Sequence, residues 1–168
     1  MHNREKAKQI VLDMVIMLAL LFVDQFTKYL SITHLKGTKG IVLIKGVLEL
    51  QYVENRGIAF SMFQGRKILI LLMGFLVLAV VLFCLFRIPQ DKKFRIVHVL
   101  FAALIAGAAG NIIYRIRFDF VVDYISFVLI HFPVFNAADC FIVVSTCILL
   151  VLFLFIYKEE DLKFLSFH

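Results

Sequence analysis

The stretch FNAADCFIVV, residues 135–144, opens the last long apolar run of the chain with an asparagine and an aspartate. Asn136 and Asp139 have the spacing of the N-cap and N3 positions of a helix. An acid in the first turn is favoured there, because the start of a helix carries a partial positive charge. The stretch therefore predicts that an apolar helix begins directly after Asn136.

Apolar residues are abundant in this chain and fall in blocks. Hydrophobic types make up 62% of the 168 residues and charged types 18%, whereas soluble domains carry about a quarter charged residues. Four blocks approach the ~20 residues that cross a bilayer. We predict an α-helical membrane protein of one domain, residues 1–168, with transmembrane helices at about residues 10–30, 68–86, 96–114 and 138–157.

The first block has the basic start of a secretory signal peptide, but no small-residue cleavage site follows it. We therefore expect it to be retained as a helix. Four spans place both termini on one side of the membrane. The dense basic clusters before residue 10 and over residues 87–95 favour the cytoplasm for that side.

The net charge of +6 comes mostly from basic residues between the apolar blocks. In that position they contact anionic lipid and fix the topology of the helices. No basic stripe interleaved with aromatic residues is present, so we expect no nucleic-acid partner.

Two connections carry further patterns. Residues 40–63 alternate apolar and polar types with many β-branched residues, which predicts short strands in a small extracytoplasmic sheet between the first two helices. Residues 115–136 are apolar but too interrupted to span a membrane. We expect this second connection to lie in the membrane interface.

Polar residues near the membrane spans need a reason, because a charge at membrane depth costs about 2.5–3.5 kcal/mol. Asp24 and Lys28 stand four residues apart in the first span, so they form either a helical ion pair or part of a site. Asn111 and Arg115 have the same spacing, on a stripe of small residues that lets helices approach closely. This stripe is either a packing seam with a polar end or a means of bringing both residues against other helices.

Asp123 has no helix start nearby and stands among Val, Tyr, Ile and Phe. If it lies at the depth of Asp139, the two carboxylates face each other and cannot both ionise easily. Such a pair can activate a water molecule, one acid taking its proton while the other protonates a carbonyl oxygen. The alternative is that Asp139 only caps its helix.

Other chemistries find little support. The chain has no His-Glu-x-x-His motif, no Gly-x-Ser-x-Gly elbow and no glycine-rich phosphate loop. A Cys140–His131 pair is conceivable, but Cys140 begins a buried helix with no evident base to orient it. The three cysteines lie in or beside apolar runs and do not suggest disulfides. We expect no metal and no organic cofactor.

Five stretches, taken together, resemble the lipoprotein signal peptidases (signal peptidase II). They have the order and spacing seen in that family and cover nearly the whole chain: VDQFTKYL (23–30), ENRGIAFSMF (54–63), GAAGNIIYR (107–115), VVDYI (121–125) and FPVFNAAD (132–139). The resemblance implies an aspartic endopeptidase of the bacterial cytoplasmic (inner) membrane. Such enzymes remove the signal peptide of prolipoproteins by cutting just before the diacylglyceryl-modified cysteine.

The resemblance also implies roles for individual residues. The catalytic pair would be Asp123 and Asp139. Polar residues lining the substrate site would be Asn55, Asn111, Arg115 and Asn136, and structural support would come from Asp24, Lys28, Gly57, Gly107 and Gly110. The implied partners are prolipoproteins with a diacylglyceryl-cysteine and membrane lipid, with the site near the outer leaflet. We expect a monomer.

The sequence departs from the family pattern at two positions near the proposed site. Tyr114 stands where the family usually has an acid that could orient Arg115, and Asp119 stands where glycine is common. We expect Asp119 to face water. A non-enzymatic membrane protein, such as a transporter subunit or an assembly factor, remains the alternative, and an ion-coupled carrier would need its acids near the bilayer midplane.

Overall fold

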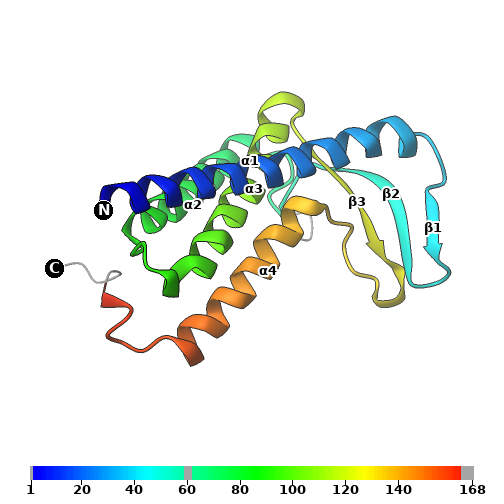
Figure 1. Ribbon diagram of the computed structural model, residues 1–168. Helices are drawn as coiled ribbons and strands as arrows, with labels where there is room; N and C mark the ends of the chain where they lie inside the picture. The colour runs from blue at the N-terminus through cyan, green and yellow to red at the C-terminus, as the bar shows by residue number, and fades with distance from the viewer. Residues whose placement is uncertain (1, 59–61, 164–168) are drawn as a thin grey trace.

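The structure, a computed structural model, describes residues 2–58 and 62–163, which form four long helices and one three-stranded antiparallel sheet (Figure 1). The helices are α1 (His2–Leu35), α2 (Lys67–Arg87), α3 (Arg95–Phe118) and α4 (Ala137–Val151), the last continued by the π-helical segment η4 (Leu152–Ile156). The strands are β1 (Ile41–Ile44), β2 (Leu48–Asn55) and β3 (Val121–Phe127), with short 3-10 turns at η2 (Lys92–Phe94) and η3 (Val128–Ile130).

Within the described residues, four helices are long and apolar enough to span a membrane, which confirms the predicted fold class. Helices α1, α2 and α3 extend past the predicted apolar blocks, α1 most of all, because hydropathy marks the stretch in lipid rather than the ends of a helix. The fourth helix begins one residue earlier than predicted, and with η4 it ends at Ile156, one residue before the predicted end. The first residues of α1 are largely Arg, Glu, Lys and Gln, which are polar but form helices well.

Helix α3 is the centre of the bundle, since α1, α2 and α4 all pack against it. Most of its side chains are buried, whereas α1, α2 and α4 expose large apolar residues such as Phe22, Leu72 and Leu150. This surface suits contact with lipid, where helices associate through close packing rather than through a hydrophobic driving force.

Two glycines allow the closest helix contacts. A Cβ at Gly107 would lie 2.6 Å from the backbone oxygen of Ala138 and 2.8 Å from Cγ1 of Ile142, both at the start of α4. A Cβ at Gly110 would collide with the carboxylate of Asp24 on α1. The predicted stripe of small residues thus brings α1 and α4 against α3.

The sheet has the order β1-β2-β3 and lies at the end of the bundle where α1 ends and α4 begins (Figure 1). Strands β1 and β2 confirm the strands predicted between the first two helices, although residues 59–61 of that segment lie outside the described residues. Strand β3 was not predicted, and it comes from the connection between α3 and α4. It pairs with β2 in a register that sets Val53 opposite Asp123 and Asn55 opposite Val121.

We predict that Gly107→Ala destabilises the protein by about 1–3 kcal/mol, because the added methyl meets backbone that cannot move aside cheaply. Thermal unfolding in detergent measures the loss. The matched control is Gly74→Ala, whose methyl would lie 3.1 Å from Cγ1 of the Ile112 side chain, with no backbone atom among its close neighbours. An equal or smaller drop for Gly107→Ala than for this control would contradict the close packing of α3 and α4.

Candidate active site

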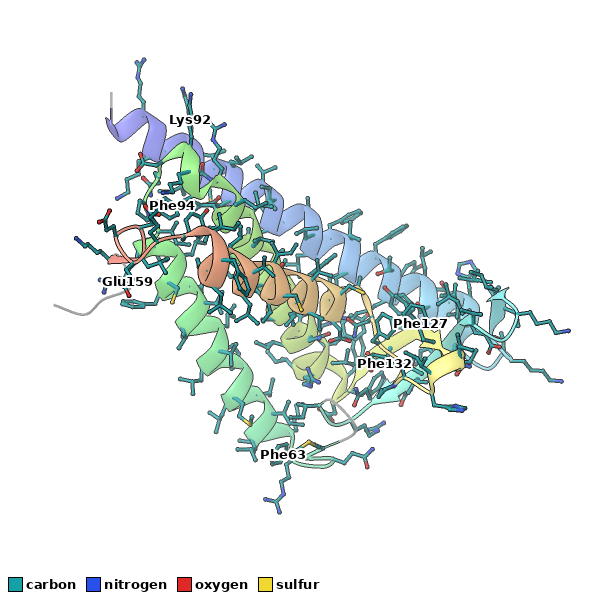
Figure 2. All side chains as sticks on the ribbon, turned by 90° about the horizontal axis from the view of Figure 1, so that it is seen from below. Phe63, Lys92, Phe94, Phe127, Phe132 and Glu159 are labelled. Carbon is teal, nitrogen blue, oxygen red and sulfur yellow. The ribbon has the colours of Figure 1, made fainter. Side chains whose placement is uncertain are left out.

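A pocket of about 700 Å³ opens between α2 and α4 at the sheet end of the bundle. Phe127, the last residue of β3, and Phe132, shortly after this strand, line the pocket. Figure 2 shows α2 and α4 diverging toward the end where Phe63 is labelled. Most of the lining is apolar. The polar lining includes the six residues that the sequence singled out for catalysis or substrate contact: Asn55, Asn111, Arg115, Asp123, Asn136 and Asp139.

Asp123 lies on β3 and is held by two amides. Asn136 Nδ2 donates to Asp123 Oδ1 at 2.6 Å, and Asn55 Nδ2 donates to Asp123 Oδ2 at 2.9 Å. The Asn55 amide is itself oriented, because its oxygen accepts a hydrogen bond from the Gly57 backbone N–H at 3.0 Å. The pairing of β2 with β3 therefore delivers one polar donor directly to this carboxylate.

Asp139 lies in the first turn of α4 and completes a capping box with Asn136. Asn136 Oδ1 accepts from the Asp139 N–H at 3.2 Å, and Asp139 Oδ2 accepts from the Asn136 N–H at 3.1 Å. The second oxygen, Asp139 Oδ1, accepts from Asn111 Nδ2 at 2.9 Å. The helix cap and the hydrogen-bond network of the pocket thus share one carboxylate.

Lys28 is fully buried and orients the Asn111 side chain that donates to Asp139. Its ammonium donates to Asp24 Oδ2 and to Asn111 Oδ1, both at 2.8 Å. An ammonium only donates, so the Asn111 oxygen must face Lys28 and the Asn111 NH₂ group must face Asp139. Asp24 Oδ1 also accepts from the Ala138 N–H at 3.1 Å. The predicted i,i+4 ion pair therefore forms and is part of the network.

Arg115 contacts backbone rather than an acid. Its Nη2 donates to the Gly57 carbonyl at 2.8 Å, and its Nη1 donates to the Asn111 carbonyl at 3.5 Å. Over residues 2–58 and 62–163, no carboxylate forms an ion pair with it. Tyr114, where the family usually has an acid, instead places its ring 5.1 Å from the Lys28 ammonium.

Asp119 does not join the two acids of the pocket. Its side chain is 60% exposed and forms an ion pair with Lys67 at the start of α2. It ends α3 in a left-handed conformation, with φ of 63°, which explains why glycine suits this position. The expectation that Asp119 faces water agrees with this exposure.

The pKa of Asp123 differs from that of an aspartate on the protein surface. Burial, and then the neighbouring charge of Asp139, raise the pKa of Asp123 from 3.8 to about 6, against the opposing effect of the Asn55 and Asn136 hydrogen bonds. Neutral amide donors stabilise the carboxylate without cancelling its charge. Asp123 therefore keeps a proton more readily than a solvent-exposed aspartate.

Sequence reasoning did not single out three residues that complete the network. Gln25 Nε2 donates to Asp24 Oδ2 at 3.0 Å and to the Gly110 carbonyl at 3.3 Å. Tyr124 and Thr27 hydrogen-bond to each other at 2.8 Å behind the pocket. The only sequence signal was that all three lie inside the stretches shared with the family.

The alternative Cys140–His131 pair does not form. Cys140 lines the pocket, but His131 is exposed, and no hydrogen bond joins the two in the described part of the chain. Among the described residues, no three His, Cys, Asp or Glu side chains are grouped so that they could hold a metal ion.

The fold and the pocket together define an integral membrane protein with a polar site at one end of an apolar helical bundle. The chain belongs to the signal peptidase II family, whose sequence model, described as "Signal peptidase (SPase) II", matches residues 16–155. It is therefore a membrane peptidase by family.

Relatives support the same assignment. The lipoprotein signal peptidase of Caldanaerobacter subterraneus subsp. tengcongensis is 39% identical over 142 residues, covering 84% of this chain and 94% of the relative. That of Clostridioides difficile is 36% identical over 150 residues, covering 89% and 99%. A bacterial membrane enzyme solved by the in meso method at 2.3 Å resolution is 25% identical, with a TM-score of 0.76 over 89% of this chain and 93% of that one.

We predict that Lys28→Met destabilises the protein by about 3–5 kcal/mol, because it leaves the Asp24 carboxylate buried without its counter-charge. Thermal unfolding in detergent measures the loss. The control is Lys67→Met, which breaks the exposed ion pair with Asp119 and costs about 0–1 kcal/mol. Equal losses for the two variants would show that the buried pair does not anchor the fold.

We predict that Asp139→Asn lowers the pKa of Asp123 below about 6, because the neutral amide no longer repels the ionised Asp123. Infrared titration of the carboxyl stretch, with Asp123→Asn to assign the band, measures the shift. Asp119→Asn serves as the control and leaves the pKa in place, since Asp119 is exposed and paired with Lys67. An unchanged or higher pKa in Asp139→Asn would mean that the two acids do not interact.

Proposed function

We propose that this chain is an aspartic endopeptidase that removes the signal peptide of diacylglyceryl-modified prolipoproteins by cutting just before the lipidated cysteine. One observation carries the proposal: Asn136 donates to both acids of the pocket, through its side chain to Asp123 and through its backbone to Asp139. A buried Asp123 carboxylate and a half-buried Asp139 carboxylate, both hydrogen-bonded to one residue, match the acid–base pair that peptide hydrolysis needs. Family membership supplies the reaction class and the substrate class.

In the proposed mechanism a water molecule lies between the two acids, and Asp123 enters the cycle protonated. The ionised Asp139 takes one proton from the water as the water oxygen attacks the scissile carbonyl carbon, and Asp123 gives its proton to the carbonyl oxygen. When the resulting diol collapses, Asp139 passes its proton to the leaving nitrogen and Asp123 recovers a proton from a hydroxyl. The raised pKa of Asp123 supports its assignment as the initial acid.

The pocket lining supports an apolar substrate. Ile70, Met73 and Val77 line it from α2, and Ile142 and Val143 line it from α4. A signal helix and acyl chains can contact such walls while the peptide bond reaches the acids. We place the site near the outer leaflet of the bacterial cytoplasmic membrane, with both termini in the cytoplasm. Because one chain supplies both acids and the amides around them, we propose that a monomer suffices.

A non-enzymatic role is the competing candidate, and the capping box favours it, because a helix cap alone would explain Asp139. The two candidates differ in what Asp139→Asn does. Asparagine caps a helix about as well as aspartate. If Asp139 is only a cap, Asp139→Asn therefore folds and keeps the activity of wild type.

The test is mass spectrometry of a diacylglyceryl-modified prolipoprotein incubated with purified protein in detergent. We expect wild type to release a product that begins with the lipidated cysteine. Asp123→Asn and Asp139→Asn should each lower turnover about 10³-fold or more while remaining folded. Asp119→Asn is the matched control, an acid removed outside the pocket, and should cleave like wild type.

Two results would overturn the proposal. Cleavage by both folded Asn variants would remove the two acids from the chemistry. A folded wild type that leaves the lipidated substrate intact would favour the non-enzymatic role.

A further inference from the structure

The first turn of α4, which carries Asp139, is held by partners on several elements. Its first four N–H groups all donate hydrogen bonds. The acceptors are Tyr124 Oη for Ala137 at 3.2 Å, Asp24 Oδ1 for Ala138 at 3.1 Å, Asn136 Oδ1 for Asp139 at 3.2 Å and the Asn136 carbonyl for Cys140 at 3.2 Å. Tyr124 is thus the partner that β3 supplies to the helix.

The hydrogen-bond direction at Tyr124 is fixed by its neighbours. The Ala137 N–H can only donate, so the phenol oxygen accepts it and the phenol proton goes to Thr27 Oγ1 at 2.8 Å. The Thr27 hydroxyl proton then goes to the Val23 or Asp24 carbonyl, at 2.8 and 3.0 Å. The chain of hydrogen bonds therefore runs one way, from α4 through β3 to α1.

Tyr124 is well placed to control the distance between the two acids. It follows Asp123 directly on β3, and successive strand residues point to opposite faces. Asp123 faces the pocket, while Tyr124 is buried with Leu35, Tyr114, Val121 and Val122 and does not line the pocket. The phenol thus reaches α4 two residues before Asp139, from the neighbour of the other acid.

Backbone hydrogen bonds also join β3 to the segment before α4, but they reach only as far as Phe135. The N–H groups of Tyr124 and Ile125 donate to the Phe135 carbonyl at 3.0 and 2.8 Å, and the Phe135 N–H donates to Ile125. These bonds hold the chain as far as Phe135. The orientation of the helical turn after Phe135 depends on the groups that accept hydrogen bonds from its first N–H groups.

We propose that Tyr124, oriented by Thr27, is a positioning residue that sets the separation of Asp123 and Asp139. The proposal rests on the two-acid mechanism given above. The phenol touches neither the substrate pocket nor the reacting atoms, so it acts through the place it gives to the first turn of α4. Burial raises the pKa of Tyr124, which keeps the phenol protonated and able to donate to Thr27.

The test is Tyr124→Phe, which keeps the ring and removes only the hydroxyl. We expect kcat for the lipidated prolipoprotein to fall about ten- to a hundredfold, because small misplacements of catalytic groups have effects of this size. KM should stay within about twofold, since the pocket lining is untouched. The pH profile of kcat should also shift, because the interaction between the two carboxylates depends on their distance.

The matched control is Tyr157→Phe. Tyr157 is also buried, and its hydroxyl donates to the Lys93 carbonyl at 2.9 Å, in the cluster with Ile88 and Phe94 rather than beside the acids. It loses a comparable buried hydrogen bond, so thermal stability should fall by a similar amount. Its kcat and pH profile should match those of wild type.

Variants at Thr27 decide the matter if Tyr124→Phe does not fold. Thr27→Ser keeps the acceptor for the phenol and should retain wild-type kcat, whereas Thr27→Val removes it and should lower kcat. The proposal is wrong if folded Tyr124→Phe keeps the wild-type kcat, if Tyr157→Phe loses as much activity, or if KM rather than kcat changes. Asp139→Asn in the same assay separates the two proposals: cleavage by that variant refutes the two-acid mechanism, while its inactivity beside a fully active Tyr124→Phe refutes only the positioning role.

Discussion

A lysine ammonium with no exposed surface is the constraint on which the rest of this structure depends. A buried charge costs several kcal/mol unless it is surrounded by oxygen atoms, and Lys28 finds them on Asp24 and Asn111. Each of those residues then has one further polar group, the second carboxylate oxygen of Asp24 and the NH₂ group of Asn111, that needs a hydrogen-bond partner. Asp24 Oδ1 accepts a hydrogen bond from the Ala138 N–H, and the Asn111 NH₂ group donates one to Asp139. One cation on α1 therefore fixes both the start of α4 and the hydrogen bond to one acid of the pocket.

This network closes only because the backbones lie close together. Lipid gives little hydrophobic drive for helix association, so small residues and polar contacts determine how the helices pack. Gly110 leaves room for the Asp24 carboxylate, and Gly107 leaves room for the first turn of α4. The same two glycines that permit packing thus permit the polar contacts, and the site could not form on a bundle with wider spacing.

The sequence predicted the parts of the structure that depend on local pattern. Hydropathy located the spanning helices, alternation located β1 and β2, and the Asn136–Asp139 spacing located the start of α4. Strand β3 was missed because its hydrogen-bond partners are some seventy residues earlier, as the pairing of Val53 with Asp123 shows. Tyr124 was missed for a similar reason. A tyrosine in an apolar run is ordinary, and its role depends on contacts with α1 and α4 that no local pattern records.

Helix capping explains only part of the hydrogen bonding of Asp139 and none of that of Asp123. The cap oxygen is Asn136 Oδ1, and Asp139 completes the capping box with Oδ2 alone, while its Oδ1 accepts from Asn111. Asp123 caps no helix, and no described lysine or arginine forms an ion pair with either acid. Its hydrogen-bond partners are neutral amides, and burial raises its pKa against the opposing effects of these amides and of the more distant Lys28 charge. Two acids without a cation partner are costly for stability, and such a cost is typical of groups that a fold keeps for chemistry rather than for its own support.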